Sequence, residues 1–228
     1  MRRAQCTRET RETCISVQLN LDGTGLAQVD TGIGFFDHML DSWARFACFD
    51  LELKAEGDLH VDAHHTVEDC GIVLGQVLKE ALGDKGGIER VGDALFPMDE
   101  ALAQVAVDIS GRGYLAWGDN IVQSTHAQLK DITCTVHLEE DQAGQPSLGE
   151  RDYLVSAGKT GIFPFELAEE FFRALACNAG ITLHVRLLAG KNSHHVLEAV
   201  FKGVGRALRL AGSVSGRYSG APSTKGSL

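Results

Sequence analysis

The chain has 228 residues, a formal net charge of −10 and a pI near 5.3. This length can bury a substantial core, either as one domain or as two fused halves. An acidic chain argues against nucleic acid and anionic membranes as partners, because both require a basic face. An anionic substrate would therefore need a local cationic pocket. No apolar run approaches the roughly 18 residues of a membrane span, so we expect no membrane contact.

The six cysteines occur singly, with no Cys-x-x-Cys pair, and the polar opening MRRAQCTRETRET does not resemble a secretory leader. Reduced thiols are the simplest explanation of this pattern. The sequence therefore predicts a soluble, cytoplasmic protein.

The first half of the chain predicts the order strand, strand, helix, strand, helix. Residues 13–21 alternate apolar and polar side chains, 22–25 are typical of a turn, and 26–30 resume an extended pattern, which together predict a hairpin. A helix is expected from about 34 to 48, extended segments at 50–56 and 59–61, and a helix from 66 to 82.

The second half repeats this order, with strands at 101–110 and 114–117, a helix at 164–177, a strand at 181–188 and a helix at 194–211. The pattern predicts an α+β fold of two duplicated halves, each a small sheet with helices on one face. We place the first half at residues 1–92, the second at 93–212 and a C-terminal tail at 213–228. A segment around 119–160 is predicted to be inserted in the second half as a surface hairpin.

The motif His-His-x-x-Glu opens the last predicted helix of each half, and the two copies lie 130 residues apart. Imidazole and carboxylate groups together bind zinc, manganese or iron. Adjacent histidines on a helix diverge by roughly 100°, so each pair should serve two different ions. One copy cannot supply four to six ligands, so the second copy or another subunit must complete each shell.

Two further side chains extend the ligand set. His38 precedes the first copy and is expected to support it, and aligning the two preceding helices places Glu170 opposite His38, in support of the second copy. His60 and His184 lie in apolar surroundings and are expected to pack or to support ligands. The candidate metal ligands are His38, His64, His65, Glu68, Glu170, His194, His195 and Glu198.

Alternative interpretations remain open for these residues. A single His-His pair is common on a solvated surface, and His38 alone would suit a hydrogen-bonded helix residue. Glu170 stands beside Glu166 and Glu169 and would also suit a solvated acidic face. The repetition at equal spacing is what favours metal binding.

Residues 30–40, 57–61, 64–70, 97–101, 108–112 and 222–226 closely resemble the imidazoleglycerol-phosphate dehydratase family. The resemblance covers nearly the whole chain apart from a central stretch, and it implies a ribosomal protein S5 domain 2-like fold. It also implies a lyase of histidine biosynthesis that dehydrates D-erythro-imidazole glycerol phosphate to imidazole acetol phosphate. The implied cofactor is Mn²⁺, two ions per active site, although other divalent metals suit these ligands. The implied assembly is a homo-oligomer of 24 subunits that share their sites.

The resemblance further implies roles for individual residues. Proton removal requires a positioned base, and Glu12 occupies the family's position, with Glu68 and Glu198 able to assist; an exposed strand-end carboxylate is the alternative for Glu12. The substrate carbon is not acidified by a carbonyl, so the imidazole ring must take up the electron pair, which Lewis-acidic ions would favour. Candidate phosphate ligands are Arg90, Arg112, Lys202, Ser223, Thr224 and Lys225.

This chain departs from the family pattern in places. Many members have His where Glu170 stands, which adds negative charge and should weaken the preference for softer metals. Ala63 and Ser193 replace Asp before the two His pairs, so ligand orientation should rely on other groups. A catalytically weakened, metal-binding relative is therefore one alternative. A di-iron oxygenase is another, but it needs four long helices with Glu-x-x-His motifs.

Overall fold

A computed structural model describes residues 2–118, 163–217, 220 and 222–224. The first half contains β1 (Arg3–Glu9), β2 (Thr13–Asn20), β3 (Ala27–Asp30), α1 (Gly34–Ala47), β4 (Asp50–Gly57) and α2 (His64–Leu82). The second contains β5 (Val91–Met98), β6 (Ala101–Asp108), β7 (Tyr114–Trp117), α4 (Glu166–Ala179), β8 (Thr182–Ala189) and α5 (Ser193–Gly212). The predicted insertion lies outside the described residues.

The two halves have the same topology, which confirms the duplicated α+β fold. Each forms a four-stranded sheet, ordered β1-β2-β4-β3 in the first half and β5-β6-β8-β7 in the second. In each sheet the third strand in sequence, β3 or β7, runs parallel to its neighbour, and the other pairs are antiparallel. The second sheet begins at Val91, just before the expected boundary between the halves.

Three strand predictions were wrong. β2 forms its hairpin with β1, which was not predicted, and β3 instead pairs in parallel with β4. β5 was also missed. Residues 59–61 form a turn in which the Val61 N–H donates to the Asp58 carbonyl over 2.7 Å, and His60 is exposed rather than packed in a strand. The alternating polar residues of β1 and the Gly92 and Pro97 of β5 weaken the usual signals of a strand.

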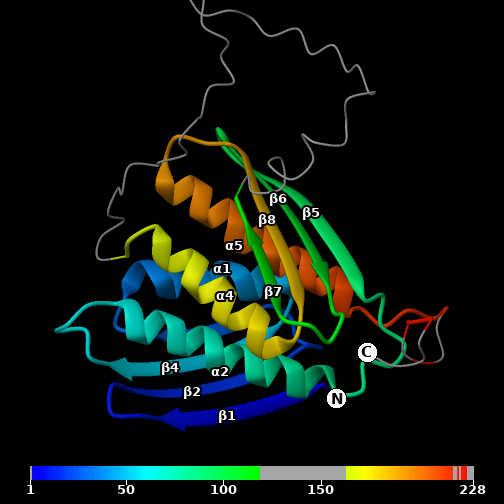
Figure 1. Cartoon of the computed structure of the whole chain (residues 1–228), viewed down its shortest axis with the longest axis horizontal. Helices are drawn as coiled ribbons and strands as arrows, with labels where there is room; N and C mark the ends of the chain where they lie inside the picture. The colour runs from blue at the N-terminus through cyan, green and yellow to red at the C-terminus, as the bar shows by residue number, and fades with distance from the viewer. Residues whose placement is uncertain (1, 119–162, 218–219, 221, 225–228) are drawn as a thin grey trace, which may run out of the picture.

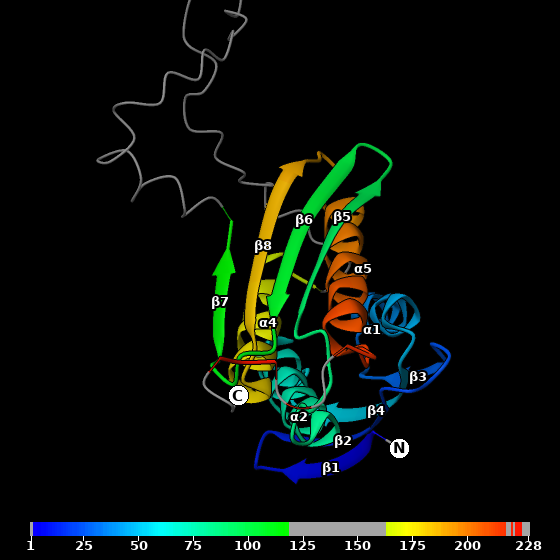
Figure 2. The ribbon, with the colours of Figure 1, turned by 90° about the vertical axis from the view of Figure 1, so that its right-hand side faces the viewer.

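The four helices of the described residues form one layer between the two sheets (Figures 1 and 2). α2 lies on the first sheet and pairs with α4, whereas α5 lies on the second sheet and pairs with α1. Glycines allow both helix pairs to approach closely: a Cβ on Gly75 would lie 2.7 Å from the Leu175 carbonyl oxygen, and one on Gly205 would overlap that of Trp43. Gly75 and Gly205 are also 130 residues apart. The pair α2 and α4 is therefore equivalent to the pair α5 and α1.

Aromatic side chains from both halves share one core. Phe36 of α1 lies edge-on to Phe171 of α4, with ring centroids 5.2 Å apart, and Phe171 stacks on Phe201 of α5 at 5.6 Å. All three are fully buried, and each such side chain stabilises the fold by about 1.5–3 kcal/mol. The halves are thus interdependent rather than separate domains.

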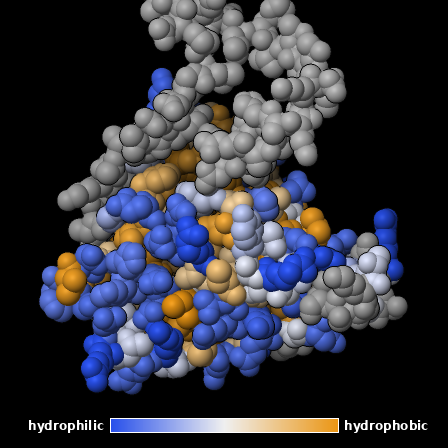
Figure 3. Space-filling view, viewed as in Figure 1, coloured by the Kyte–Doolittle hydropathy of each residue, from blue (hydrophilic) through white to orange (hydrophobic). Residues whose placement is uncertain are grey.

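The surface of the described residues is predominantly polar on the face shown in Figure 3, where apolar residues form small separate groups. None of the described helices has both the length and the apolar character needed to cross a membrane.

Candidate functional site

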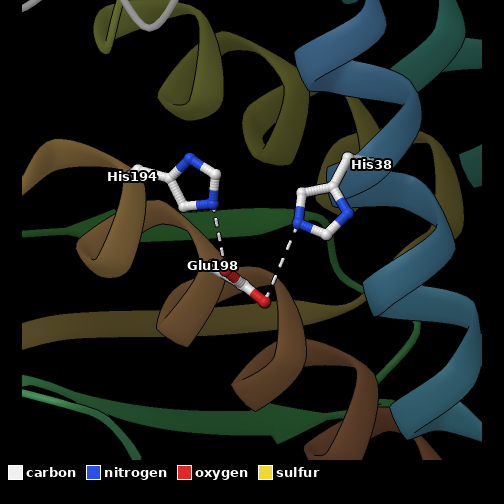
Figure 4. A group of neighbouring side chains, drawn as sticks. All are labelled: His38, His194 and Glu198. Carbon is white, nitrogen blue, oxygen red and sulfur yellow. Dashed lines mark ion pairs between the residues drawn. The ribbon is translucent and has the colours of Figure 1, made fainter.

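His38, His194 and Glu198 form a compact group between α1 and α5 (Figure 4). Their ligand atoms lie within 4.8 Å of one another. His194 Nε2 is 3.2 Å and His38 Nε2 is 3.8 Å from the Glu198 carboxylate. We had assigned His38 to the first motif copy, and this was wrong: the helix that carries it packs against α5, so His38 joins the second copy.

Local hydrogen bonds fix the start of α1 and so the position of His38. The Asp37 carboxylate accepts from the Thr31 N–H over 2.9 Å and from the Thr31 hydroxyl over 2.6 Å. At the start of α5 the Asn192 side chain accepts from the backbone N–H groups of His194 and His195, as an N-cap. Both helix starts are therefore held in place independently of any ligand.

Lys202 lies directly beside this group. Its Nζ is 2.6 Å from Glu198 Oε1 and 5.3 Å from the ring centre of Phe46. Burial alone would raise the pKa of Glu198, but the hydrogen bond and charge of Lys202, together with His38 and His194, lower it below its usual range. Glu198 is thus kept as a buried anion.

The first motif copy is more open. His64 Nε2 lies 3.8 Å from Glu68 Oε2, and both side chains are about half exposed. Glu170 lies on α4, which packs against α2. The two helices are close at this point, because a Cβ on Gly71, one turn beyond Glu68, would be 2.6 Å from the carbonyl oxygen of Phe171, the residue after Glu170. Glu170 thus belongs beside the first copy rather than the second. Its carboxylate is 3.7 Å from Arg173 Nε, and within the described part of the chain it joins no compact group like that of His38.

His65 and His195 are oriented differently from the histidines that precede them. The rings of each His-His pair are nearly perpendicular, at 88° and 86°. His65 Nδ1 lies 3.0 Å from the Asp58 carboxylate, and His195 Nδ1 lies 2.7 Å from that of Glu100. These hydrogen bonds raise the pKa of both histidines, and His195 lowers the pKa of Glu100 to about 2. A carboxylate on Nδ1 orients the ring and leaves Nε2 to bind a ligand, and His195 Nε2 lies 3.7 Å from the Asp99 carboxylate.

Sequence reasoning missed Asp58, Glu100, Asp62 and Asn192. Asp62 accepts from the His64 N–H over 2.8 Å, as Asn192 does from that of His194 over 2.9 Å. A usable signal existed for this second pair, because each stands two positions before a motif and such residues favour helix starts. Asp58 and Glu100 gave no such signal, since their contacts depend on the fold.

Glu12 lies in the β1–β2 turn, and its carboxylate is 3.8 Å from His65 Nδ1. The Asp58 N–H donates to the Glu12 carbonyl over 3.1 Å, which joins the turn to the residue that orients His65. More than half of the Glu12 side chain is exposed. This carboxylate is therefore accessible to a molecule bound near His65.

The candidate phosphate ligands are divided between two regions. Arg90 donates to both oxygens of Asp108, at 2.7 and 3.1 Å, and to the Pro222 carbonyl at 3.0 Å. Arg112 is exposed near the same end of β6. The described tail residues lie there too: Ser223 and Thr224 follow Pro222, and Lys225 lies outside the described residues.

Lys202 lies at the other end of the β5–β6 hairpin, where its Nζ is 3.9 Å from Met98 Sδ. An eight-residue strand spans roughly 25 Å, so Arg90 and Arg112 cannot reach the His38 group of the same chain.

These features define a duplicated α+β protein that carries histidine–carboxylate groups at the start of the last helix of each half. The family model for imidazoleglycerol-phosphate dehydratase matches residues 31–143 and 133–208. The chain belongs to the imidazoleglycerol-phosphate dehydratase family, whose members are hydro-lyases of histidine biosynthesis.

Relatives match the chain over its full length. The imidazoleglycerol-phosphate dehydratase of Desulfitobacterium hafniense is 55% identical over 228 residues, covering 100% of this chain and 99% of that protein. That of Dinoroseobacter shibae is 50% identical, covering 100% of both.

Solved structures of the family agree with the fold. The crystal structure of the Staphylococcus aureus enzyme has a TM-score of 0.67 at 34% identity and covers 92% of this chain and 97% of that chain. The structure from Pyrococcus furiosus has a TM-score of 0.69 at 33% identity and covers 98% and 100%.

Proposed function

We propose that this protein dehydrates D-erythro-imidazole glycerol phosphate to imidazole acetol phosphate in histidine biosynthesis, with the help of divalent metal ions. The observation that carries the proposal is the compact group of His38, His194 and Glu198 at the repeated motif, in a chain 55% identical to a protein named for this activity. Family membership supports the substrate, and the side-chain chemistry supports the metal.

The residues of this group fit a divalent cation. Two imidazoles and a buried carboxylate kept anionic by its neighbours are suitable donors for manganese, zinc or iron, and we propose Mn²⁺, two ions per site. His64, Glu68 and Glu170 would form the equivalent set at the other motif copy. Bound ions would act as Lewis acids on the imidazole ring of the substrate and stabilise negative charge that develops there.

We propose that each complete site takes residues from more than one copy of the chain. His65 and His195 each have Nδ1 bound to a carboxylate, and neither belongs to the compact ligand group found among the described residues. Arg90 and Arg112 also lie at the far end of the sheet from the His38 group. A homo-oligomer, as in the 24-subunit assembly implied by the family resemblance, would bring these groups together.

In this proposal Glu12 removes the proton from the middle carbon of the glycerol chain, and the electron pair of that C–H bond forms the double bond of an enol. The hydroxyl on the carbon attached to the imidazole ring leaves with a proton as water, and Glu68 or Glu198 assists this proton transfer. The resulting enol becomes the ketone by moving one proton. Arg112, Lys202 and the C-terminal residues Ser223, Thr224 and Lys225 would hold the phosphate, with Arg90 positioning the tail through Pro222.

The direct test is to assay full-length protein, stripped of metal and then supplied with Mn²⁺, for ketone formation from imidazole glycerol phosphate. We expect turnover that depends on Mn²⁺. The single variants His65→Ala and His195→Ala should each lose both bound metal and turnover. A wild-type protein that binds Mn²⁺ but forms no ketone would instead be the catalytically weakened relative. The di-iron alternative is disfavoured, because the described helices lie between two sheets rather than in a four-helix bundle.

A further inference from the structure

The two halves each place a hairpin tip beside the second histidine of a motif. Glu12 precedes Thr13, the first residue of β2, and Glu100 precedes Ala101, the first residue of β6. Glu12 approaches His65 and Glu100 approaches His195. Figure 1 shows the tip of each hairpin at the side where α2 or α5 begins. The two glutamates therefore occupy equivalent positions in the repeat.

These equivalent glutamates are held differently. Glu100 binds His195 directly and also accepts from the N–H groups of Lys191 and Asn192, over 3.3 and 2.9 Å. Its own carboxylate thus fixes the β5–β6 tip. The Glu12 carboxylate lies 3.8 Å from His65 Nδ1, whereas Asp58 makes the direct hydrogen bond to that nitrogen at 3.0 Å. The equivalent strand end of the second half carries Gly190, which has no side chain.

A different set of contacts fixes the β1–β2 tip to α2. Asp69 Oδ2 is 2.6 Å from Arg8 Nη1 of β1, and it accepts from the Thr13 hydroxyl of β2 over 2.5 Å. Arg8 and Thr13 stand on either side of the turn that carries Glu12. Asp69 lies one helical turn beyond His65 and is buried. This network therefore sets the position of the tip relative to His65.

In the second half the positions equivalent to this network carry uncharged side chains. Phe96 stands five residues before Ala101, as Arg8 stands before Thr13, and pairs with Ala103 as Arg8 pairs with Ile15. Ala199 follows His195 by four residues, as Asp69 follows His65. The positions equivalent to Arg8, Thr13 and Asp69 are therefore taken in the second half by Phe96, Ala101 and Ala199, respectively. The fold does not need these polar groups, and a buried ion pair is weak evidence for stability.

We propose that Arg8, Thr13 and Asp69 are positioning residues that hold the Glu12 carboxylate in place for proton removal. The network replaces the contacts by which Glu100 fixes the other tip, and it leaves the Glu12 carboxylate more than half exposed, with the 3.8 Å ion pair to His65, and accessible to substrate. The inference rests on the proposed function, since it assigns the network to the base of that reaction.

The second half supplies the variant for the test: Arg8→Phe, Thr13→Ala and Asp69→Ala together copy its apolar residues. We expect a folded protein with wild-type oligomeric state, metal content and KM, but with kcat reduced about 100-fold, as for a catalytic group displaced by about 1 Å. Hydrogen exchange at residues 10–12 should accelerate. The control is Thr7→Ala, which removes the Thr7–Ser16 hydrogen bond on the other face of the hairpin and should leave kcat unchanged.

A combination with Glu12→Gln separates this proposal from a purely structural role. If the network acts through Glu12, the apolar triple variant should lower kcat no further once Glu12→Gln is present, since residues that act as a unit are not additive. Multiplicative losses would overturn the proposal, as would a triple variant with wild-type kcat.

Two further outcomes are distinguishable. If the triple variant does not fold, Asp69→Asn, which keeps the shape but removes the charge, should lower kcat at unchanged KM, and unchanged kcat would overturn the proposal. An inactive wild-type protein would refute the proposed function instead. In that case unchanged hydrogen exchange at residues 10–12 in Asp69→Asn would still overturn the positioning role.

Discussion

At the scale of single residues, the two proposed ligand groups differ in chemistry although the repeat makes their positions equivalent. His38 and Glu170 hold matching places on α1 and α4, so one proposed set has two imidazoles and one carboxylate and the other has one imidazole and two carboxylates. Lys202 neutralises Glu198, whereas Ile72 stands at the matching position beyond Glu68. The first-copy set should therefore carry more negative charge and favour harder cations.

Substitution of Glu170 tests this difference. Glu170→Gln should lower Mn²⁺ affinity at one class of sites at least about tenfold, and Glu170→His should raise the bound Zn²⁺-to-Mn²⁺ ratio. Elemental analysis after equilibrium dialysis measures both. The control is Glu169→Gln, because Glu169 is a neighbouring carboxylate paired with Arg173. Equal metal content in Glu170→Gln and wild type would show that Glu170 is a solvated surface residue.

The His195–Glu100 pair predicts how metal uptake depends on pH. The hydrogen bond from Glu100 raises the pKa of His195, so the metal-free imidazole keeps its proton to higher pH than usual. A metal requires the neutral ring, so Mn²⁺ affinity should fall as pH drops through this raised pKa, and uptake near pH 6.5 should release protons. Calorimetry in two buffers of different ionisation enthalpy measures the release. Identical heats in both buffers would contradict the prediction.

At the scale of elements, the closeness of the helix pairs decides which ligands meet. His38 reaches the second motif copy because Gly205 lets α5 lie against the backbone of α1, and Gly75 does the same for α2 and α4. No pattern within either half indicates that helices pair across the repeat. The sequence alone therefore could not show that His38 lies beside the second motif copy.

Adding a methyl group at these contacts should loosen the helix pairs. Gly205→Ala and Gly75→Ala place a Cβ against backbone atoms that cannot move aside, so each should reduce the free energy of unfolding by about 1–3 kcal/mol despite alanine's better helix propensity. Gly212→Ala is the control, because its nearest neighbour is a Leu82 methyl at 3.9 Å. Urea denaturation measures all three. A Gly205→Ala variant as stable as the control would contradict the close packing described here.

Much of the fold was nevertheless predictable. Both motif helices, both preceding helices and the strands with clear alternation were found because their apolar periodicity is strong. The β2–β3 hairpin was wrong because a glycine-containing turn predicts a reversal of the chain but not which strand pairs with which. The candidate ligands were named from spacing alone, whereas Asp58 and Glu100 depend on strand ends that meet the histidines only after folding.

At the scale of the whole molecule, one core joins two halves that each present part of a site. The arginines at the far end of the β5–β6 hairpin cannot reach the His38 group of the same chain, and neither His65 nor His195 belongs to that compact group. We therefore propose that activity belongs to an assembly in which different copies contribute different groups to one site.

Complementation between two inactive variants tests whether one site draws residues from different chains. His194→Ala removes a ligand of the metal group, and Arg112→Ala removes a proposed phosphate ligand. When the two are assembled together with Mn²⁺, some sites should draw His194 from one chain and Arg112 from the other, and ketone formation should recover well above that of either variant alone. Mixed assemblies that remain as inactive as their parents would contradict the account, because each site would then be built from a single chain.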